Sequence, residues 1–246
     1  VVALVFWVLV RDHPEGTQKP IAKPLGEPDG HAMPPRPVTR MPFGRMLAML
    51  AGNRGMWLFG LLQFCNNISW AFLVTLLPTY LKDANVEIGL RGWIQTGVLL
   101  AGCVGMLIGG LVTDALRRRL GARWGRSVPI ATMMSLCAAM CAVVSSSPGL
   151  WFAVAALAMM ALCQDLGIPS VWAYAQDVGG KNAGAALGFG NMLGNFGATL
   201  SPILLGSVSR AGGWEASFAL CAACYVVAAI SGLLLDASKP LDVNDV

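Results

Sequence analysis

The chain has 246 residues, of which 56% are hydrophobic and only 12% are charged, with a formal net charge of +4. A soluble domain usually carries about 25% charged residues, so this composition excludes an ordinary soluble domain and indicates that much of the surface faces lipid. The 29 glycines fit closely packed membrane helices, in which small residues let the backbones approach one another.

The first ten residues, VVALVFWVLV, form an apolar run that ends at Arg11 and Asp12. About 20 apolar residues are needed to cross the hydrocarbon core, so this run is half of a spanning helix. A signal peptide would need a charged start and a small-residue cleavage site, and neither is present in this run. We therefore expect 1–10 to be the end of a truncated transmembrane helix and the chain to be part of a longer protein.

Residues 11–54 differ from the rest of the chain, since they hold 8 of the 14 prolines, both histidines and a mixed set of charges. This composition predicts an extended polar linker rather than a domain. The histidines suggest no metal site. All seven cysteines lie in apolar stretches, where small packing residues are the better interpretation. We expect neither a metal nor another cofactor.

Six apolar stretches follow the linker, and each is long enough, or nearly so, to cross a bilayer as a helix. The turn cluster at 145–149, which contains serines, proline and glycine, separates the third stretch from the fourth. Together the stretches predict a six-helix bundle over 55–235, followed by a tail at 236–246. The predicted spans are 55–81, 92–113, 127–144, 150–176, 183–208 and 216–235.

The lysines and arginines are divided unequally between the two sides that these spans define. Fourteen of the 17 lie in the linker, in the loop after the second span, at Lys181 or in the tail. The opposite side carries Lys82, Arg91 and Arg210. The positive-inside rule therefore predicts that the linker and the C-terminus are cytoplasmic. We expect a multi-pass protein of the cell (plasma or inner) membrane that contacts the lipid bilayer. We do not expect it to bind nucleic acid.

Polar residues lie at helical spacing within the first predicted span. They are spaced i, i+3, i+4 and i+7, which puts them on one helical face: Gln63, Asn66, Asn67 and Trp70. Amides at membrane depth normally face a bundle interior or a water-filled cavity, because lipid cannot satisfy them. We interpret this face as a wall of a substrate cavity. Hydrogen bonding between helices is the alternative interpretation.

Asp165 is the only charged residue inside any full predicted span, and it lies about midway along its helix. A carboxylate at that depth is costly unless it is paired, hydrated or protonated. Pro169 and Trp172 share its face, and the proline loosens the helix because it cannot donate to the Asp165 carbonyl. Asp165 is a candidate site for a coupling proton or Na+, or a contact for a substrate hydroxyl. A structural carboxylate bonded across helices is equally open.

Three stretches of the sequence, taken in order, are similar to motifs of one protein family. WVLVRDHPE, from Trp7 to Glu15, is similar to the end of the sixth helix in that family. GLVTDALRRR, from Gly110 to Arg119, is similar to its loop G-x-x-x-D-x-x-x-R-R, although Arg117 stands where glycine is common. The stretch from Gly184 to Gly206 is similar to its eleventh helix, with a G-N-x-x-G-N core and a following Ser-Pro. Together these stretches resemble the major facilitator superfamily and, more narrowly, its anion:cation symporter family.

The resemblance implies an all-α membrane protein, the six-helix C-terminal bundle of a twelve-helix major facilitator fold with a 3+3 inverted repeat. It also implies a missing N-terminal half. In this family the arginines that hold an anionic substrate come chiefly from that half, and no Lys or Arg lies inside any full span here. Three more residues would belong to the substrate wall by resemblance: Trp172, Asn191 and Asn195.

The loop motif implies a conformational latch at the cytoplasmic end of the second span. An Asp in this position can cap a neighbouring helix N-terminus and pair with Arg, and the contact opens and closes during the transport cycle. In the alternative interpretation the arginines only follow the positive-inside rule. The predicted latch residues are Gly110, Asp114, Arg118 and Arg119.

The function implied by the resemblance is secondary active transport of a small organic anion, such as a sugar acid or other carboxylate. Transport would be coupled to H+ or Na+ and would proceed by alternating access. Another substrate class (neutral sugar, nitrate or drug) and a non-transporting half-chain fragment stay open as alternatives. A dimerising half-size transporter would require a complete chain, and the truncated first helix argues against it. An enzyme is not expected, because one intramembrane Asp does not make a catalytic pair.

Overall fold

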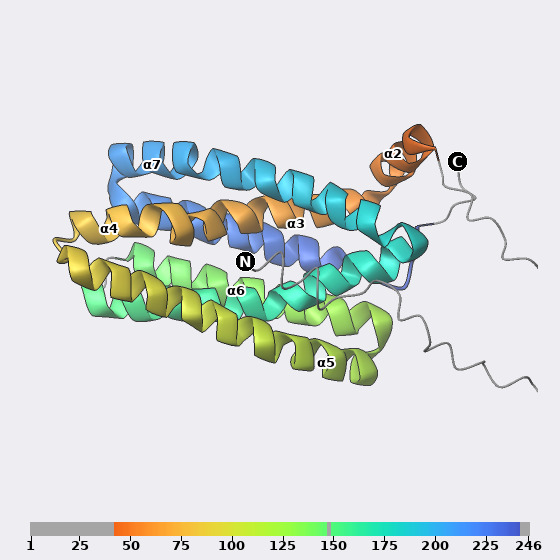
Figure 1. Ribbon diagram of the computed structural model, residues 1–246, viewed down its shortest axis with the longest axis horizontal. Helices are drawn as coiled ribbons and strands as arrows, with labels where there is room; N and C mark the ends of the chain where they lie inside the picture. Colours follow the sequence, from red (N-terminus) through yellow and green to blue (C-terminus); the bar gives the residue numbers. More distant parts are fainter. Residues whose placement is uncertain (1–41, 147–148, 242–246) are drawn as a thin grey trace, which may run out of the picture. The chain divides into compact units, whose positions relative to one another are not determined.

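The computed structural model describes residues 42–146 and 149–241, and every regular element in these ranges is helical. The predictions for 1–10 and for 11–41 lie outside the described residues. Figure 1 shows the long helices side by side, with α3 against α7 and α5 against α6. The elements are α2 (Phe43–Gly52), α3 (Arg54–Ala71), the π-helix η1 (Phe72–Leu76), α4 (Leu77–Asp83), α5 (Ile88–Ser145), α6 (Leu150–Gly179), the 3-10 turn η2 (Gly180–Asn182) and α7 (Ala183–Leu234).

Two of the long helices fold back on themselves at glycine. α5 has 58 residues and α7 has 52, so either would be more than twice as long as the ~30 Å hydrocarbon core if it were straight. Gly121 interrupts α5 with a φ of 78°, and Gly213 interrupts α7 with a φ of 74°. Positive φ is costly for a residue with a Cβ, so glycine permits both reversals.

Among the residues that the structure describes, three helical stretches are long and apolar enough to cross a membrane: Arg54–Asp83, Ile88–Ser145 and Leu150–Leu234. The second and third contain the glycine reversals, and the third also contains the turn at η2. The second and third stretches therefore divide into shorter helical segments. Helices of this length and apolar composition confirm the predicted all-α membrane fold. The six segments are 54–83, 88–120, 122–145, 150–179, 183–211 and 214–234.

Two details predicted from composition and charge are wrong. Residues 43–52, expected in an extended linker, form α2, which buries Met49 and Leu50. The basic loop expected after the second span is helical on both sides of Gly121, because α5 continues through the arginines. Arg and Lys favour helix, so helices extend beyond the charge-free stretch that lies in the hydrocarbon.

Glycines bring neighbouring helices into backbone contact at two crossings. In α5, Gly105 and Gly109 lie against the backbone of Leu162 and Leu166 in α6, where an added Cβ would overlap the carbonyl oxygens. In α7, Gly197 lies in the same way against the backbone of Phe64 in α3. Such close approach is typical of helix packing in membranes, where small residues replace large ones at the contact.

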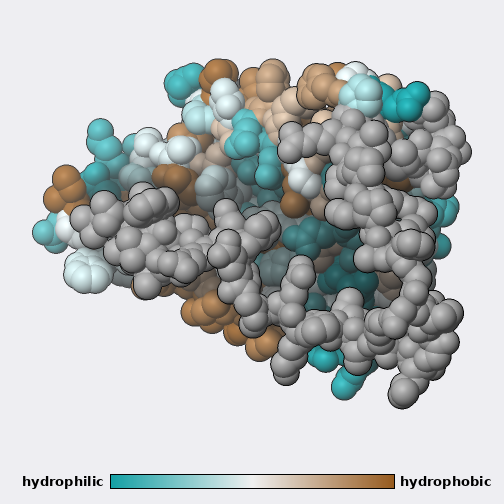
Figure 2. All heavy atoms as spheres, turned by 45° about the vertical axis from the view of Figure 1, so that its right-hand side comes forward, coloured by the Kyte–Doolittle hydropathy of each residue, from teal (hydrophilic) through white to brown (hydrophobic). Residues whose placement is uncertain are grey.

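Large apolar side chains lie on the outside of the described bundle. Figure 2 shows brown hydrophobic side chains at the surface in view, next to teal hydrophilic ones. Because a soluble protein rarely exposes extended apolar surface, these side chains fit contact with lipid. The most exposed of them include Trp93, Leu107, Leu111, Phe196 and Ile203.

Candidate functional site

A hollow of about 300 Å³ lies among α3, α5, α6 and α7. Its wall draws on four helices, so it brings together residues that are far apart in the sequence. Polar and aromatic side chains make up most of the lining, and Asp165 is the charged one. The lining residues are Gln63, Asn66, Asn67, Trp70, Met106, Gln164, Asp165, Ile168, Trp172 and Asn191.

Seven of the eight residues predicted for the substrate cavity line this hollow. The eighth, Asn195, is exposed on α7 and does not line it. The structure adds Met106, Gln164 and Ile168, which sequence reasoning missed. Gln164 is a buried amide inside an apolar span, a pattern that could have identified it. The two apolar residues carried no such signal.

Amide side chains join α3 to α7 beside the hollow. Nε2 of Gln63 donates to Oδ1 of Asn191 at 3.4 Å and so links the two helices. Within α3, Nδ2 of Asn67 donates to the backbone carbonyl of Gln63 at 2.8 Å. Gly194 permits this packing, because a Cβ at that position would lie 2.8 Å from the amide nitrogen of Asn67. The interhelical hydrogen bonding considered as an alternative is therefore present, and it exists alongside the hollow.

Two amide oxygens of α3 are buried without a hydrogen-bond partner among the described residues. They are Oε1 of Gln63 and Oδ1 of Asn66, in residues that are 3% and 2% exposed. A buried acceptor left unpaired costs about 1–3 kcal/mol. Because both residues line the hollow, a bound group that donates hydrogen bonds or carries positive charge can satisfy these oxygens.

Asp165 lies where α6 crosses the first segment of α5. Its carboxylate packs directly over Gly102, where an added Cβ would overlap Oδ2. Within the described ranges Asp165 makes no ion pair, and neither Lys nor Arg lines the hollow. The neighbouring residue, Gln164, accepts a short hydrogen bond from the hydroxyl of Tyr225, which ties α6 to α7 beside the hollow.

The helix that carries the polar face changes geometry directly after it. The π-helix η1 begins at Phe72, two residues after Trp70, and Pro78 follows at the start of α4. The carbonyl of Leu73 accepts a hydrogen bond of 2.6 Å from the amide nitrogen of Gln95 in α5. π-turns inside helices frequently occur near functional sites, and this one borders the hollow through Trp70.

The four predicted latch residues lie on α5 ahead of its reversal. All but Gly110 are exposed, and none makes an ion pair within the part of the chain that the structure describes. Arg117, which departs from the motif, does make an ion pair here. The latch therefore remains a prediction for Gly110, Asp114, Arg118 and Arg119.

Asp177, near the end of α6, binds two arginines of α5. Nε of Arg126 lies 2.8 Å from Oδ2 of Asp177, and Nη2 of Arg117 lies 3.3 Å from Oδ1. Gly125 lets the second segment of α5 approach, because a Cβ there would lie 2.5 Å from Cα of Arg117. The cluster joins both segments of α5 to α6, and sequence reasoning missed its pairing because the three residues fall outside the predicted spans.

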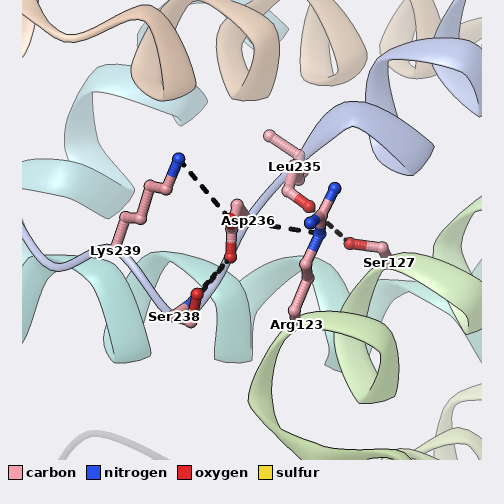
Figure 3. Close-up of polar contacts among 6 residues, drawn as sticks. All are labelled: Arg123, Ser127, Leu235, Asp236, Ser238 and Lys239. Carbon is pink, nitrogen blue, oxygen red and sulfur yellow. Dashed lines mark hydrogen bonds and ion pairs between the residues drawn. The ribbon is translucent and has the colours of Figure 1, made fainter.

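The residues after α7 return to this same end of the bundle (Figure 3). Ser127 donates a hydrogen bond of 2.6 Å to the Leu235 carbonyl, and Asp236 lies 4.0 Å from Nε of Arg123. The pKa of Asp236 is held below its usual range, chiefly by the hydrogen bond from the Ser238 hydroxyl, then by the Ser238 backbone N–H and the nearby cations. The start of the predicted tail is therefore attached to the bundle.

Asp236→Asn is expected to lower the unfolding temperature at pH 7, and this effect is expected to shrink as the pH falls below about 3.9. Because folding lowers the pKa of Asp236, the stabilisation is fully present above the ordinary value of about 3.9 and is lost as pH falls through the lowered folded value. Thermal unfolding in detergent at several pH values measures this, with Glu87→Gln at an exposed position as the control. A difference that is the same at every pH would contradict the assignment.

Comparison with known proteins gives a consistent result. The sequence matches the family described as Major Facilitator Superfamily over residues 1–177 and 59–245. It is 28% identical over 196 residues to the probable sulfoacetate transporter SauU of Cupriavidus necator, which covers 78% of this chain and 45% of that protein. It is 27% identical over 195 residues to the probable galactarate/D-glucarate transporter GudP of Escherichia coli (strain K12), which covers 77% and 42%. For GudP of Pseudomonas putida the identity is 30% over 172 residues, with 68% and 37% covered, so the chain spans less than half the length of these relatives.

Proposed function

Because the chain belongs to the major facilitator superfamily, we propose that it supplies one half of a secondary active transporter for a small organic anion, coupled to H+ or Na+. The family match and the relatives named as transporters support a transporter rather than an enzyme. The names sulfoacetate transporter and galactarate/D-glucarate transporter support an organic anion as the substrate. Since the chain spans less than half the length of these relatives, the proposal includes an N-terminal half that completes the cavity.

The observation that carries the proposal is the hollow and the chemistry of its wall. Two tryptophans offer apolar surface to a carbon chain, and the side-chain amides of Asn67 and Asn191 offer hydrogen-bonding groups to hydroxyl groups. Galactarate and glucarate carry several hydroxyl groups, whereas sulfoacetate has none. Within the organic anions the hollow therefore favours a sugar acid.

The hollow carries a negative charge, that of Asp165, and an anionic substrate needs positive charge from elsewhere in the transporter. Because no Lys or Arg of the described residues lines it, we expect the positive charge that holds an anion to come from the proposed N-terminal half. The same observation favours a neutral sugar as the second candidate substrate, since such a sugar needs no positive charge. The sugar acid is preferred because the relatives are named for acids.

In the proposed orientation the end of the bundle that holds Asp177 is cytoplasmic, because the basic residues gather there. The tail at 236–246 is then cytoplasmic as well, and the protein lies in the cell membrane. Alternating access gives the latch its role: the side chains of Asp114, Arg118 and Arg119 are exposed, so they are available to pair with the other half during the cycle.

Trp172→Ala is expected to raise the KM for D-glucarate uptake by about tenfold, because the indole ring lines the hollow. Trp151→Ala is the matched control, since Trp151 is exposed on the same helix but does not line the hollow. Uptake of labelled D-glucarate by cells that express the complete transporter measures the change. An equal KM in the two variants would contradict the site.

Competition in the same assay separates the substrate classes. Unlabelled galactarate is expected to compete with D-glucarate, sulfoacetate is expected to compete weakly, and glucose is expected not to compete. Uptake of labelled glucose that the acids do not inhibit would favour the second candidate. Absence of uptake for every probe would contradict the proposed transport function.

A further inference from the structure

We propose that Asp165, together with the amide oxygens of Gln63 and Asn66, binds the monovalent cation that drives transport. This inference rests on the proposed function, to which it adds a place for the coupling cation. The three side chains come from α6 and α3 and line one hollow. H+ and Na+ share the chemistry required, which is neutralisation of a carboxylate among neutral oxygen atoms.

The charge of Asp165 is unbalanced within the described residues. Asp165 is the charged residue of the lining, and within the described ranges it makes no ion pair. A carboxylate at membrane depth is costly unless a proton or a cation neutralises it. One bound monovalent cation removes this cost, whereas an anionic substrate group placed beside the carboxylate would add to it.

Two amide oxygens of residues that line the same hollow also lack a partner in the described part of the chain, independently of the carboxylate. Oε1 of Gln63 and Oδ1 of Asn66 are buried and have no partner among the described residues. Neutral oxygens of this kind are ligands that hard cations accept, and they also accept hydrogen bonds from a protonated carboxyl group. Sites for divalent cations combine several carboxylates, so one carboxylate with neutral oxygens suits a cation of single charge.

The other groups that face Asp165 do not supply the missing charge. Two titratable side chains interact with it electrostatically, the thiol of Cys137 in α5 and the phenol of Tyr225 in α7. Both are neutral at pH 7, because thiols and phenols do not ordinarily ionise below that pH. From α3, the hollow receives the uncharged amides Gln63 and Asn66, and from α7 it receives the amide Asn191. A cation in the hollow therefore meets one negative charge, that of Asp165.

The position of Asp165 also connects cation binding to helix packing. Its carboxylate lies directly over Gly102 at the crossing of α5 and α6. An ionised carboxylate pressed against a helix backbone is poorly solvated, and a bound cation or proton relieves that penalty. Occupancy of the site therefore changes the free energy of the crossing, which is the kind of differential interaction that a conformational cycle requires.

Asp165→Asn in the complete transporter separates coupling from substrate binding. We expect at least a tenfold loss of uphill D-glucarate accumulation driven by an imposed pH or Na+ gradient. Equilibrium exchange of labelled for unlabelled D-glucarate requires no net coupling, so we expect it to fall by a smaller factor than uphill accumulation does. The pH-gradient arm and the Na+-gradient arm identify which cation is used. Glu87→Gln makes the same acid-to-amide change at an exposed position and is expected to retain both activities.

Each other outcome of this experiment has a defined meaning. Uphill accumulation that persists in Asp165→Asn overturns the inference. Loss of exchange together with accumulation, in a variant that elutes as the unchanged protein does, assigns Asp165 to substrate binding or to structure and also overturns it. Absence of exchange by the unchanged transporter refutes the proposed function itself, so the two failures are distinguishable.

A second measurement uses the unchanged protein and covers the case in which the variant does not fold. A hydrophobic carbodiimide modifies protonated carboxyl groups within the membrane, and mass spectrometry of peptides locates the adduct. We expect modification of Asp165 that decreases as pH rises and, if Na+ is the coupling cation, decreases further when Na+ is added at fixed pH. Modification that is absent, or that responds to neither pH nor Na+, overturns the inference.

Discussion

Gly105→Ala is expected to destabilise the bundle by about 1–3 kcal/mol, whereas Gly97→Ala on the same helix is expected to stabilise it slightly. Both positions are helical in α5, so the local substitution is the same. At Gly105 an added Cβ would overlap the carbonyl oxygen of Leu162 in α6, and at Gly97 nothing lies within 4 Å of an added Cβ. The two variants should therefore differ in the sign of the effect.

The opposite signs have separate physical causes. Alanine favours helix over glycine by about 0.5–1 kcal/mol, and this gain is available where space allows. At Gly105 the new atom meets backbone, which cannot rotate away as a flexible side chain does, so α5 and α6 have to separate. That separation would also disturb the contacts of Gly102 with Asp165 and of Gly109 with Leu166 along the same crossing.

Thermal and SDS-induced unfolding of the purified protein in detergent measures both variants against the unchanged protein. Uptake assays on the same pair add a functional readout, since a loosened crossing moves the carboxylate of Asp165. Equal destabilisation by the two substitutions would contradict the backbone contact at Gly105. Stabilisation by both would show that the two helices can separate there at no cost.

The polar face of α3 could be predicted from sequence because membranes penalise misplaced amides severely. A helix that carries Gln63, Asn66 and Asn67 in an otherwise apolar span has to turn them inward, so spacing alone identifies the wall. Asn195, which family resemblance assigns to the substrate wall, does not line the hollow. It lies four residues after Asn191, which is about 40° further round the helix, and that rotation is enough to leave it outside the hollow.

The ion pairs at the end of the bundle could not be predicted in this way. Charged residues outside the hydrocarbon are free to face water, so no local pattern distinguishes the buried Arg126 from the half-exposed Arg123. What buries Arg126 is the reversal at Gly121, which returns the chain so that the arginine meets Asp177, some fifty positions further along the sequence. That contact depends on tertiary packing rather than on spacing.

Arg126→Ala is expected to destabilise the protein by about 3–5 kcal/mol, and Arg117→Ala by less than about 1 kcal/mol. Both arginines pair with Asp177, so the comparison keeps the partner constant. The Arg126 side chain is 4% exposed with a contact of 2.8 Å, whereas the Arg117 side chain is 50% exposed with a contact of 3.3 Å. The difference in burial, and not in charge, sets the difference in cost.

The larger loss of stability in Arg126→Ala arises from the groups that lose their partner when the arginine side chain is removed. Without Arg126, the carboxylate of Asp177 keeps only the solvent-screened Arg117, and a buried space opens between α5 and α6. Without Arg117, the closer contact with Arg126 still neutralises the same carboxylate. Unfolding curves for both variants, for Asp177→Asn and for the two double variants measure the pairwise coupling energies. Equal losses of unfolding free energy in Arg126→Ala and Arg117→Ala would contradict the role of this cluster in holding α5 to α6. A coupling energy of zero between Arg126 and Asp177 would contradict it as well.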